Sequence, residues 1–164
     1  MVDSVNDAVA RDLLARVIAQ PPEFLERLVL QLLRELGYGG LETTATQHLG
    51  GPGDEGLDGV IRRDALGLDV VYVQAKRYAP ERRIGRPDIQ AFVGALSGAQ
   101  ASRGVFITTS SFRREAREYA DRVGMRLVLI DGRELARLMV ERNVGVSIEE
   151  SFHLKRIDED FFDV

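Results

Sequence analysis

Three polar residues that could bind a metal ion and activate a water molecule lie near the middle of the chain: Asp58, Gln74 and Lys76. Side chains in a β-strand alternate between its two faces, so Gln74 and Lys76 share one face of the run 70–76. Hard divalent cations such as magnesium take oxygen ligands, and a neighbouring ammonium can hold or deprotonate an attacking water. The residue types therefore suit metal-assisted hydrolysis. A cross-strand polar cluster on a solvated sheet edge is the alternative interpretation.

A hairpin between the runs 57–62 and 70–76 would bring Asp58 and Gln74 together. If the hairpin closes over Ala65-Leu66-Gly67, with Gly67 in the left-handed conformation, Asp58 lies directly opposite Gln74 and Lys76 lies beside them. A shift of the register by one residue would send one member of the pair to the other face of the sheet. The predicted site thus depends on this one register.

The elements that must hold these residues follow from hydrophobic periodicity and from breaks at Pro and Gly. In chain order they are a helix over 5–19, a helix over 22–37, strands over 41–46, 57–62 and 70–76, a helix from 87, a strand over 104–108, a helix from 112, a strand over 126–130 and a helix from 131. Antiparallel strands followed by alternating strands and helices predict an α/β fold, with a mixed five-stranded sheet flanked by helices on both faces.

The whole chain of 164 residues, of which 45% are apolar, is expected to form a single domain. In this interpretation 1–20 holds an N-terminal helix that packs on the domain, and 146–164 is a C-terminal extension. We expect an added edge strand around 151–156.

Four local features make further predictions. Thr109-Ser110-Ser111 is expected to cap the helix that follows. The helix from 87 is expected to lie close to the sheet because it carries small residues: Ala91, Gly94, Ala95, Gly98 and Ala99. The apolar run 126–130 is typical of a strand covered on both faces. Asp131, with Glu134 three residues on, resembles a capping box.

Glu26 lies on the helix over 22–37, about a quarter turn from the centre of its apolar stripe. A carboxylate in this position either points back to water, which is the commoner case, or reaches into a polar site next to the core.

The net charge of −4 provides no global attraction to a polyanion, so nucleic-acid binding requires a local basic patch. The segment 76–86 is such a patch, because its one acid is Glu81 and its bases are Lys76, Arg77, Arg82, Arg83 and Arg86. Charge runs of this kind are usually solvated loops, but this one adjoins the candidate site. The lack of cysteine is compatible with the cytoplasm, and no apolar window is long enough to span a membrane.

Several blocks of sequence resemble the catalytic domain of Mrr-type restriction endonucleases, within the PD-(D/E)xK nuclease superfamily. The blocks are Pro22 to Val29 continuing through Leu36 to Gly40, Gly53 to Asp58, Val73-Gln74-Ala75-Lys76-Arg77, Gly104 to Ser110, and Leu129 to Gly132. They occur in the expected order from about residue 10 to the C-terminus. The resemblance implies a restriction-endonuclease-like fold.

The resemblance also implies roles for individual residues. Asp58 would be the metal-binding aspartate, Gln74 would replace the acidic ligand of most superfamily members, and Lys76 would be the lysine of the same motif. Glu26 would complete the metal site, directly or through water. The expected metal is Mg²⁺ or Mn²⁺. Glu55 stands where the family pattern has glycine, which leaves the roles of Asp54 and Glu55 open.

The function implied is a magnesium-dependent endonuclease acting on double-stranded DNA, as the cleavage domain of a restriction system that acts on modified DNA. The residues expected to contact DNA are Arg77, Arg82, Arg83, Arg86 and, from a glycine-rich loop, His48. A homodimer is expected because cutting both strands needs two sites, and a separate recognition domain or subunit is also expected.

The sequence leaves two alternatives open. A nucleic-acid-binding or scaffold domain of the same fold with little catalysis is suggested by Gln74 in place of an acid. A resolvase of branched DNA is the other. Nucleotide-dependent enzymes are disfavoured because no phosphate loop with Gly-Lys-Ser/Thr is present, and histidine-metal nucleases because His48 and His153 are the only histidines.

Overall fold

Two helices open the part of the chain that the computed structural model describes, which is residues 2–38 and 56–163. Helix α1 is Val2–Ile18, and α2 is Pro22–Glu35. Proline at the first position of α2 costs no hydrogen bond, because that N–H has no partner inside a helix. After α2 the chain turns at Gly37, whose φ of +96° is in the left-handed region that glycine adopts most readily.

The described strands form one mixed sheet in the order β1-β2-β3-β4. They are β1 (Gly56–Arg62), β2 (Val70–Lys76), β3 (Arg103–Thr108) and β4 (Arg126–Ile130). The first pair is antiparallel and the other two pairs are parallel, so the predicted mixed sheet is confirmed for four strands. The fifth expected strand, over 41–46, lies outside the described residues.

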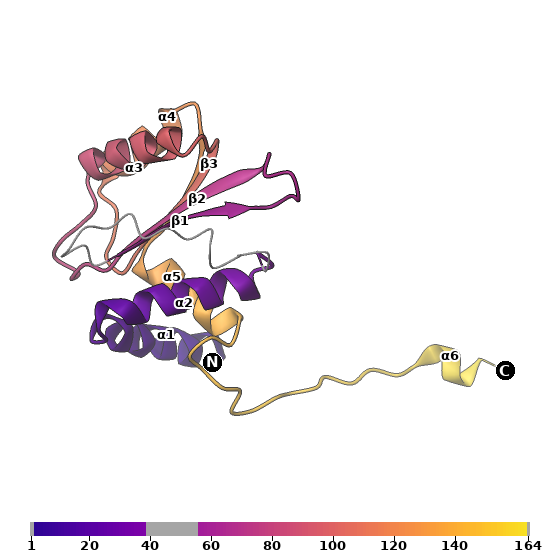
Figure 1. Ribbon diagram of the computed structural model, residues 1–164. Helices are drawn as coiled ribbons and strands as arrows, with labels where there is room; N and C mark the ends of the chain where they lie inside the picture. Colours follow the sequence, from indigo (N-terminus) through magenta and orange to yellow (C-terminus); the bar gives the residue numbers. More distant parts are fainter. Residues whose placement is uncertain (1, 39–55, 164) are drawn as a thin grey trace.

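Helices cover both faces of this sheet (Figure 1). Helices α3 (Arg86–Gly98) and α4 (Arg114–Arg122) lie on one face, while α1, α2 and α5 (Gly132–Glu141) lie on the other. On the α2 face the core contains alternate strand residues such as Ile61, Val71 and Val73. On the α3 face, four aromatic rings follow one another with centroids 5.7, 5.3 and 5.7 Å apart: Tyr72, Phe92, Phe106 and Phe112.

The close approach of α3 to the sheet has a different cause from the one expected. Gly94 and Gly98 are exposed, and a Cβ at either position would meet nothing within 4 Å. At Gly104 in β3, by contrast, a Cβ would lie 2.4 Å from Leu96 and 2.7 Å from Phe92. The glycine that lets helix and sheet approach is therefore on the strand.

Two expectations for β4 and α5 have different outcomes. Strand β4 is an edge of the described sheet, and because Val128 is 49% exposed, the strand is not covered on both faces. The start of α5 agrees with the sequence, because Asp131 Oδ1 accepts a hydrogen bond of 2.9 Å from the N–H of Glu134. The side chain of Glu134 turns instead to Arg137, whose hydrogen bond lowers the pKa of that carboxyl.

Beyond Val146 the chain runs away from the domain and ends near the short helix α6 (Glu159–Phe162) (Figure 1). The expected edge strand over 151–156 is wrong, because this segment is extended but pairs with no described strand. Its alternating apolar residues Phe152 and Leu154 are exposed. Alternating apolar and polar residues show that a segment could form a strand, but they do not show that it lies beside a strand with which it can pair. No helix among the described residues is long and apolar enough to cross a membrane.

Candidate active site

The β1–β2 hairpin has the predicted register, with Asp58 directly opposite Gln74 and Gly56 opposite Lys76. Gly67 has a φ of +69°, as the turn requires. The carboxylate of Asp64 closes the turn by accepting hydrogen bonds from the N–H groups of Leu68 at 2.7 Å and Asp69 at 3.1 Å. An Asx-type turn of this kind fixes the loop length, and with it the pairing of every residue along the two strands.

Asp58, Gln74 and Lys76 lie on the face of the sheet that α3 covers. Their neighbours along the strands, Val60 and Tyr72, belong to the aromatic core on that face. Side chains at alternate positions share a face, so the three polar groups continue the same row beyond the core. All three are half-buried. The structure thus brings together an acid, an amide and an amine at one end of the hairpin.

The pKa of the buried Tyr72 hydroxyl is affected by the nearby Asp58. Burial, followed by the negative charge of Asp58, raises the pKa of the Tyr72 hydroxyl to about 12. Both causes favour the neutral phenol.

The raised pKa of Tyr72 predicts a loss of stability in alkali. Below pH 10 the phenol is protonated in both folded and unfolded chains, so its contribution is then fully present. From about pH 10 to 12 the unfolded chain ionises first, and the free energy of unfolding falls as pH rises through this window. Tyr72→Phe should show a shallower fall when urea unfolding is measured at about pH 9 and pH 11. Equal falls in the two proteins would contradict the prediction.

Glu26 is half-buried on α2, which packs against β1 and β2 from the other face of the sheet. The strand register therefore does not place Glu26 beside Asp58 and Gln74, and its role as a ligand stays a prediction. Within residues 2–38 and 56–163, no three acidic, histidine or cysteine side chains gather as a metal site.

Arg77 has a structural contact that the sequence did not indicate. Its guanidinium donates to the carbonyl of Ile18 at 3.1 Å and to that of Gln20, at the end of α1. The last carbonyls of a helix have no partner within it and carry partial negative charge. Arg77 therefore holds α1 against the end of β2.

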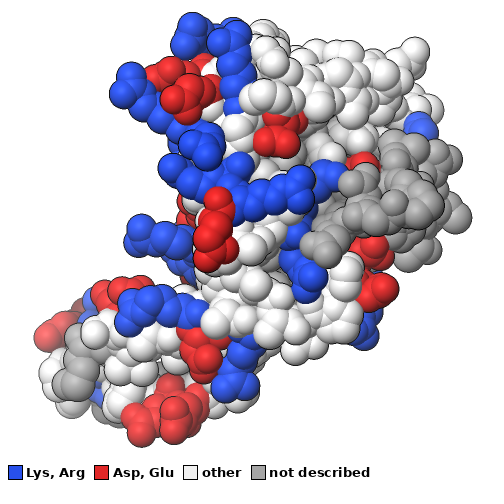
Figure 2. Space-filling model, turned by 90° about the vertical axis from the view of Figure 1, so that its left-hand side faces the viewer, with Lys and Arg blue, Asp and Glu red and all other residues white. Residues whose placement is uncertain are grey.

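The other three arginines of the basic segment are exposed, and each rests on a neighbour. Arg82 lies over the ring of Tyr78 at 3.8 Å, and Arg86 lies over Tyr119 at 5.1 Å. Figure 2 shows Lys and Arg side chains gathered along one side of a face, interrupted by Asp and Glu. Stacked guanidinium groups lose less freedom on binding a phosphate than free ones. His48, the fifth predicted DNA contact, lies outside the described residues.

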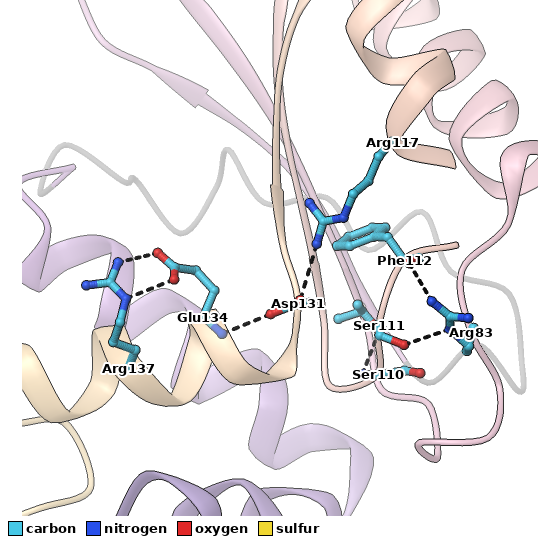
Figure 3. Close-up of polar contacts among 9 residues, drawn as sticks. Arg83, Ser110, Ser111, Phe112, Arg117, Asp131, Glu134 and Arg137 are labelled. Carbon is cyan, nitrogen blue, oxygen red and sulfur yellow. Dashed lines mark hydrogen bonds and ion pairs between the residues drawn. The ribbon is translucent and has the colours of Figure 1, made fainter. Parts of the chain in front are cut away.

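Arg83 is fixed from two directions (Figure 3). Its Nε donates to Ser111 Oγ at 3.0 Å, and its Nη2 donates to the carbonyl of Phe112 at 2.9 Å. On the other side of Phe112, Arg117 lies 5.1 Å from the ring and donates to Asp131 Oδ2 at 3.2 Å. Arg117 was not among the predicted residues, because it belongs to a helix 31 positions past the basic segment. The clustering of Arg113, Arg114 and Arg117 was the available signal.

Two solved structures share this fold. The DNA modification-dependent restriction endonuclease AspBHI aligns with a TM-score of 0.61 and 18% identity, over 86% of this chain and 36% of that chain. The MspJI restriction endonuclease, in complex with a 27-mer oligonucleotide, aligns with a TM-score of 0.55 and 25% identity, over 84% of this chain and 31% of that chain. The class of the fold is therefore restriction-endonuclease-like.

The family is shown by sequence. The restriction endonuclease model Mrr_cat matches residues 18–139, so the chain belongs to the Mrr_cat family of restriction endonucleases. The type IV methyl-directed restriction enzyme EcoKMrr of Escherichia coli (strain K12) is 48% identical over 160 residues. The alignment covers 97% of this chain and 51% of EcoKMrr, so the chain spans about half the length of that relative. These matches confirm the resemblance inferred from the sequence blocks.

Proposed function

We propose that this domain hydrolyses DNA phosphodiester bonds with Mg²⁺, or with Mn²⁺ in its place, as the cleavage domain of a restriction system that acts on modified DNA. The observation that carries the proposal is the pairing of Asp58 with Gln74, with Lys76 on the same face, in a chain of the Mrr_cat family. The name of EcoKMrr describes a methyl-directed enzyme, and MspJI was solved with an oligonucleotide. Both support DNA as the substrate.

The side chains present suit a hard divalent cation. Asp58 offers a carboxylate whose Oδ1 atom is buried, and Gln74 offers an amide oxygen from the paired position on the next strand. Oxygen donors are the ligands that Mg²⁺ takes, usually together with several waters. The proposal keeps Glu26 as a further ligand, directly or through water, on the strength of the family resemblance and not of the strand register. A cation held there would polarise the scissile phosphate and stabilise charge on the leaving oxygen.

Lys76 would act on the same phosphate from the adjacent position on β2. An ammonium group fixed on a strand can hold the attacking water or neutralise the negative charge that develops on the phosphate oxygens. Because β2 is paired on both sides, to β1 and to β3, the backbone that carries Lys76 is held firmly. Such fixed placement needs little rearrangement during the reaction.

The exposed arginines Arg82, Arg83 and Arg86 would bind the DNA backbone. Contacts to phosphates give affinity without sequence preference and make binding weaken as salt rises. Arg77 is left out of this set, because its guanidinium is engaged with α1.

A salt titration tests the binding of phosphates by these arginines. Replacing Arg82 or Arg86 by Gln should weaken binding to a duplex and lower the slope of log affinity against log salt by about 0.9 for each phosphate that the variant no longer neutralises. Fluorescence anisotropy without metal gives both quantities, and Arg156→Gln in the C-terminal extension is the matched control. If the salt slopes of these variants equal that of the control, Arg82 and Arg86 do not contact DNA phosphates.

The cleavage assay uses supercoiled plasmid, methylated and unmethylated, with Mg²⁺ or with a chelator. The chain has only two lysines, so Lys155→Met in the exposed extension is a matched control for Lys76→Met. We expect cleavage of the methylated plasmid with Mg²⁺ only, slowed at least about 100-fold by Lys76→Met and unchanged by Lys155→Met. Cleavage that survives the chelator, or that Lys76→Met leaves intact, would contradict the mechanism.

The same assay separates the remaining alternatives. DNA binding without any cleavage by the wild-type protein would favour a non-catalytic domain, for which Gln74 in place of an acid is the supporting observation. Faster cutting of branched than of linear duplexes would favour a resolvase. The proposal includes a homodimer, because two sites are needed to cut both strands, and a separate recognition part. Nicked circles as the sole product would count against the homodimer.

A further inference from the structure

Three consecutive hydroxyl residues, Thr109, Ser110 and Ser111, bind successive points along the loop that leaves β2. Thr109 Oγ1 accepts a hydrogen bond from the N–H of Tyr78 at 2.9 Å and donates one to the carbonyl of Tyr78 at 2.8 Å. Ser110 Oγ donates to the carbonyl of Pro80 at 3.3 Å. Ser111 Oγ accepts from Arg83. We call these three residues the hydroxyl clasp.

The clasp is not the helix cap that the sequence suggested. Helix α4 begins after Arg113, and no side chain caps it. The hydroxyls instead face the β2–α3 loop, and backbone bonds join the same two loops. The N–H of Thr109 donates to the carbonyl of Lys76 at 3.3 Å, and the N–H of Ile84 donates to that of Ser111 at 2.8 Å. Thr109 and Ser110 are buried, where a polar group needs a partner.

The position of these contacts relates them to the candidate site. Tyr78 is two residues past Lys76, and one hydroxyl engages both its N–H and its carbonyl. The backbone is therefore held immediately beyond Lys76, before the loop continues to Arg82 and Arg83. Without these bonds the loop and its arginines would adopt many conformations. Binding DNA would then cost the free energy of ordering them.

We propose that Thr109 is a positioning residue that fixes the strand end carrying Lys76, and that Ser111 fixes Arg83 for phosphate binding. This inference rests on the proposed function. The two neighbouring hydroxyls then have different effects: loss of the Thr109 hydroxyl should lower kcat, and loss of the Ser111 hydroxyl should weaken DNA binding. A purely structural role for the clasp would lower stability without dividing the kinetic effects in this way.

The test compares Thr109→Val, which removes the hydroxyl at nearly constant volume, with Thr109→Ser, which keeps it. Plasmid cleavage with Mg²⁺ should show kcat lowered about 100-fold in Thr109→Val, as expected for a catalytic group misplaced by about 1 Å, and KM changed little. Thr109→Ser should restore most of kcat. Amide hydrogen exchange without DNA should rise in 77–85 of Thr109→Val but not in the β1–β2 hairpin. Ser102→Ala, at an exposed position before β3, is the control.

Ser111→Ala provides the second arm, and it keeps the inference testable if Thr109→Val does not fold. Here KM should rise about threefold to tenfold, the cost of ordering one long side chain on binding, while kcat and the melting temperature stay near wild type. An unchanged KM in Ser111→Ala, or an unchanged kcat in folded Thr109→Val, would overturn the inference while the proposed function stands. A wild-type protein that cuts no DNA would refute the proposed function itself, and the exchange data would then report only on the loop.

Discussion

Asp58→Asn is expected to lower magnesium-dependent cleavage about 1000-fold while leaving the domain folded. The substitution keeps the size of the side chain and removes its negative charge, which the proposed cation site needs. Several kcal/mol of transition-state stabilisation depend on a bound cation, and about 4 kcal/mol corresponds to this factor. Single-turnover cleavage of plasmid at saturating protein measures the chemical step directly.

The control for this prediction is Asp121→Asn, which removes the same charge from an exposed position on α4. It should cut like wild type. Calorimetric titration with Mn²⁺ should show binding to the control and none to Asp58→Asn. If Asp58→Asn cuts within about tenfold of wild type, Asp58 is not the principal ligand.

The second large effect is on stability, at the first residue of α5. A Cβ on Gly132 would lie 2.4 Å from the carbonyl oxygen of Thr109 and 3.0 Å from Leu14. The oxygen belongs to the backbone, so it cannot swing away as the end of a side chain could. We expect Gly132→Ala to lower the free energy of unfolding by about 3 kcal/mol, and the melting temperature by about 10 °C.

Gly94→Ala is the matched control, because its Cβ would meet nothing within 4 Å on the exposed side of α3. Alanine favours a helix over glycine by up to about 1 kcal/mol, so this variant should be neutral or more stable. Urea unfolding at neutral pH compares the two. A Gly132→Ala protein as stable as wild type would show that β3 and α5 can separate at no cost. The clash in Gly132→Ala should also disturb the hydroxyl clasp, because the N–H of Gly132 donates to the carbonyl of Ser110.

The part of the site that sequence could predict depends on local geometry. Strand alternation and a three-residue turn at Gly67 suffice to place Asp58 opposite Gln74, because a hairpin register is set by its own loop. Prolines and glycines mark the helix ends for a similar reason. These features involve residues close in the chain, whose conformations are restricted without help from the rest of the fold.

Other roles depended on contacts between distant segments. In the sequence Arg77 is one more base in a basic run. In the structure its guanidinium donates to carbonyls 57 and 59 residues earlier in the chain. Thr109, Ser110 and Ser111 read as a cap for the next helix, yet they bind a loop about 30 residues before them. Residue type and spacing describe what a group can donate or accept, but not which distant partner is within reach.

The amino-acid sequence by itself determined the family, the hairpin register and the three polar groups on one face of the β1–β2 hairpin, since each depends on short-range pattern. Only the tertiary structure decided that Arg77 anchors α1, that three hydroxyls hold the loop after Lys76, and that 151–156 joins no described strand. The tertiary structure also placed Glu26 on α2, which packs on the face of the sheet opposite to α3. The physical reason is that these outcomes depend on which surfaces meet when the layers pack, and hydrogen-bonding groups take the partners that packing brings within about 3 Å.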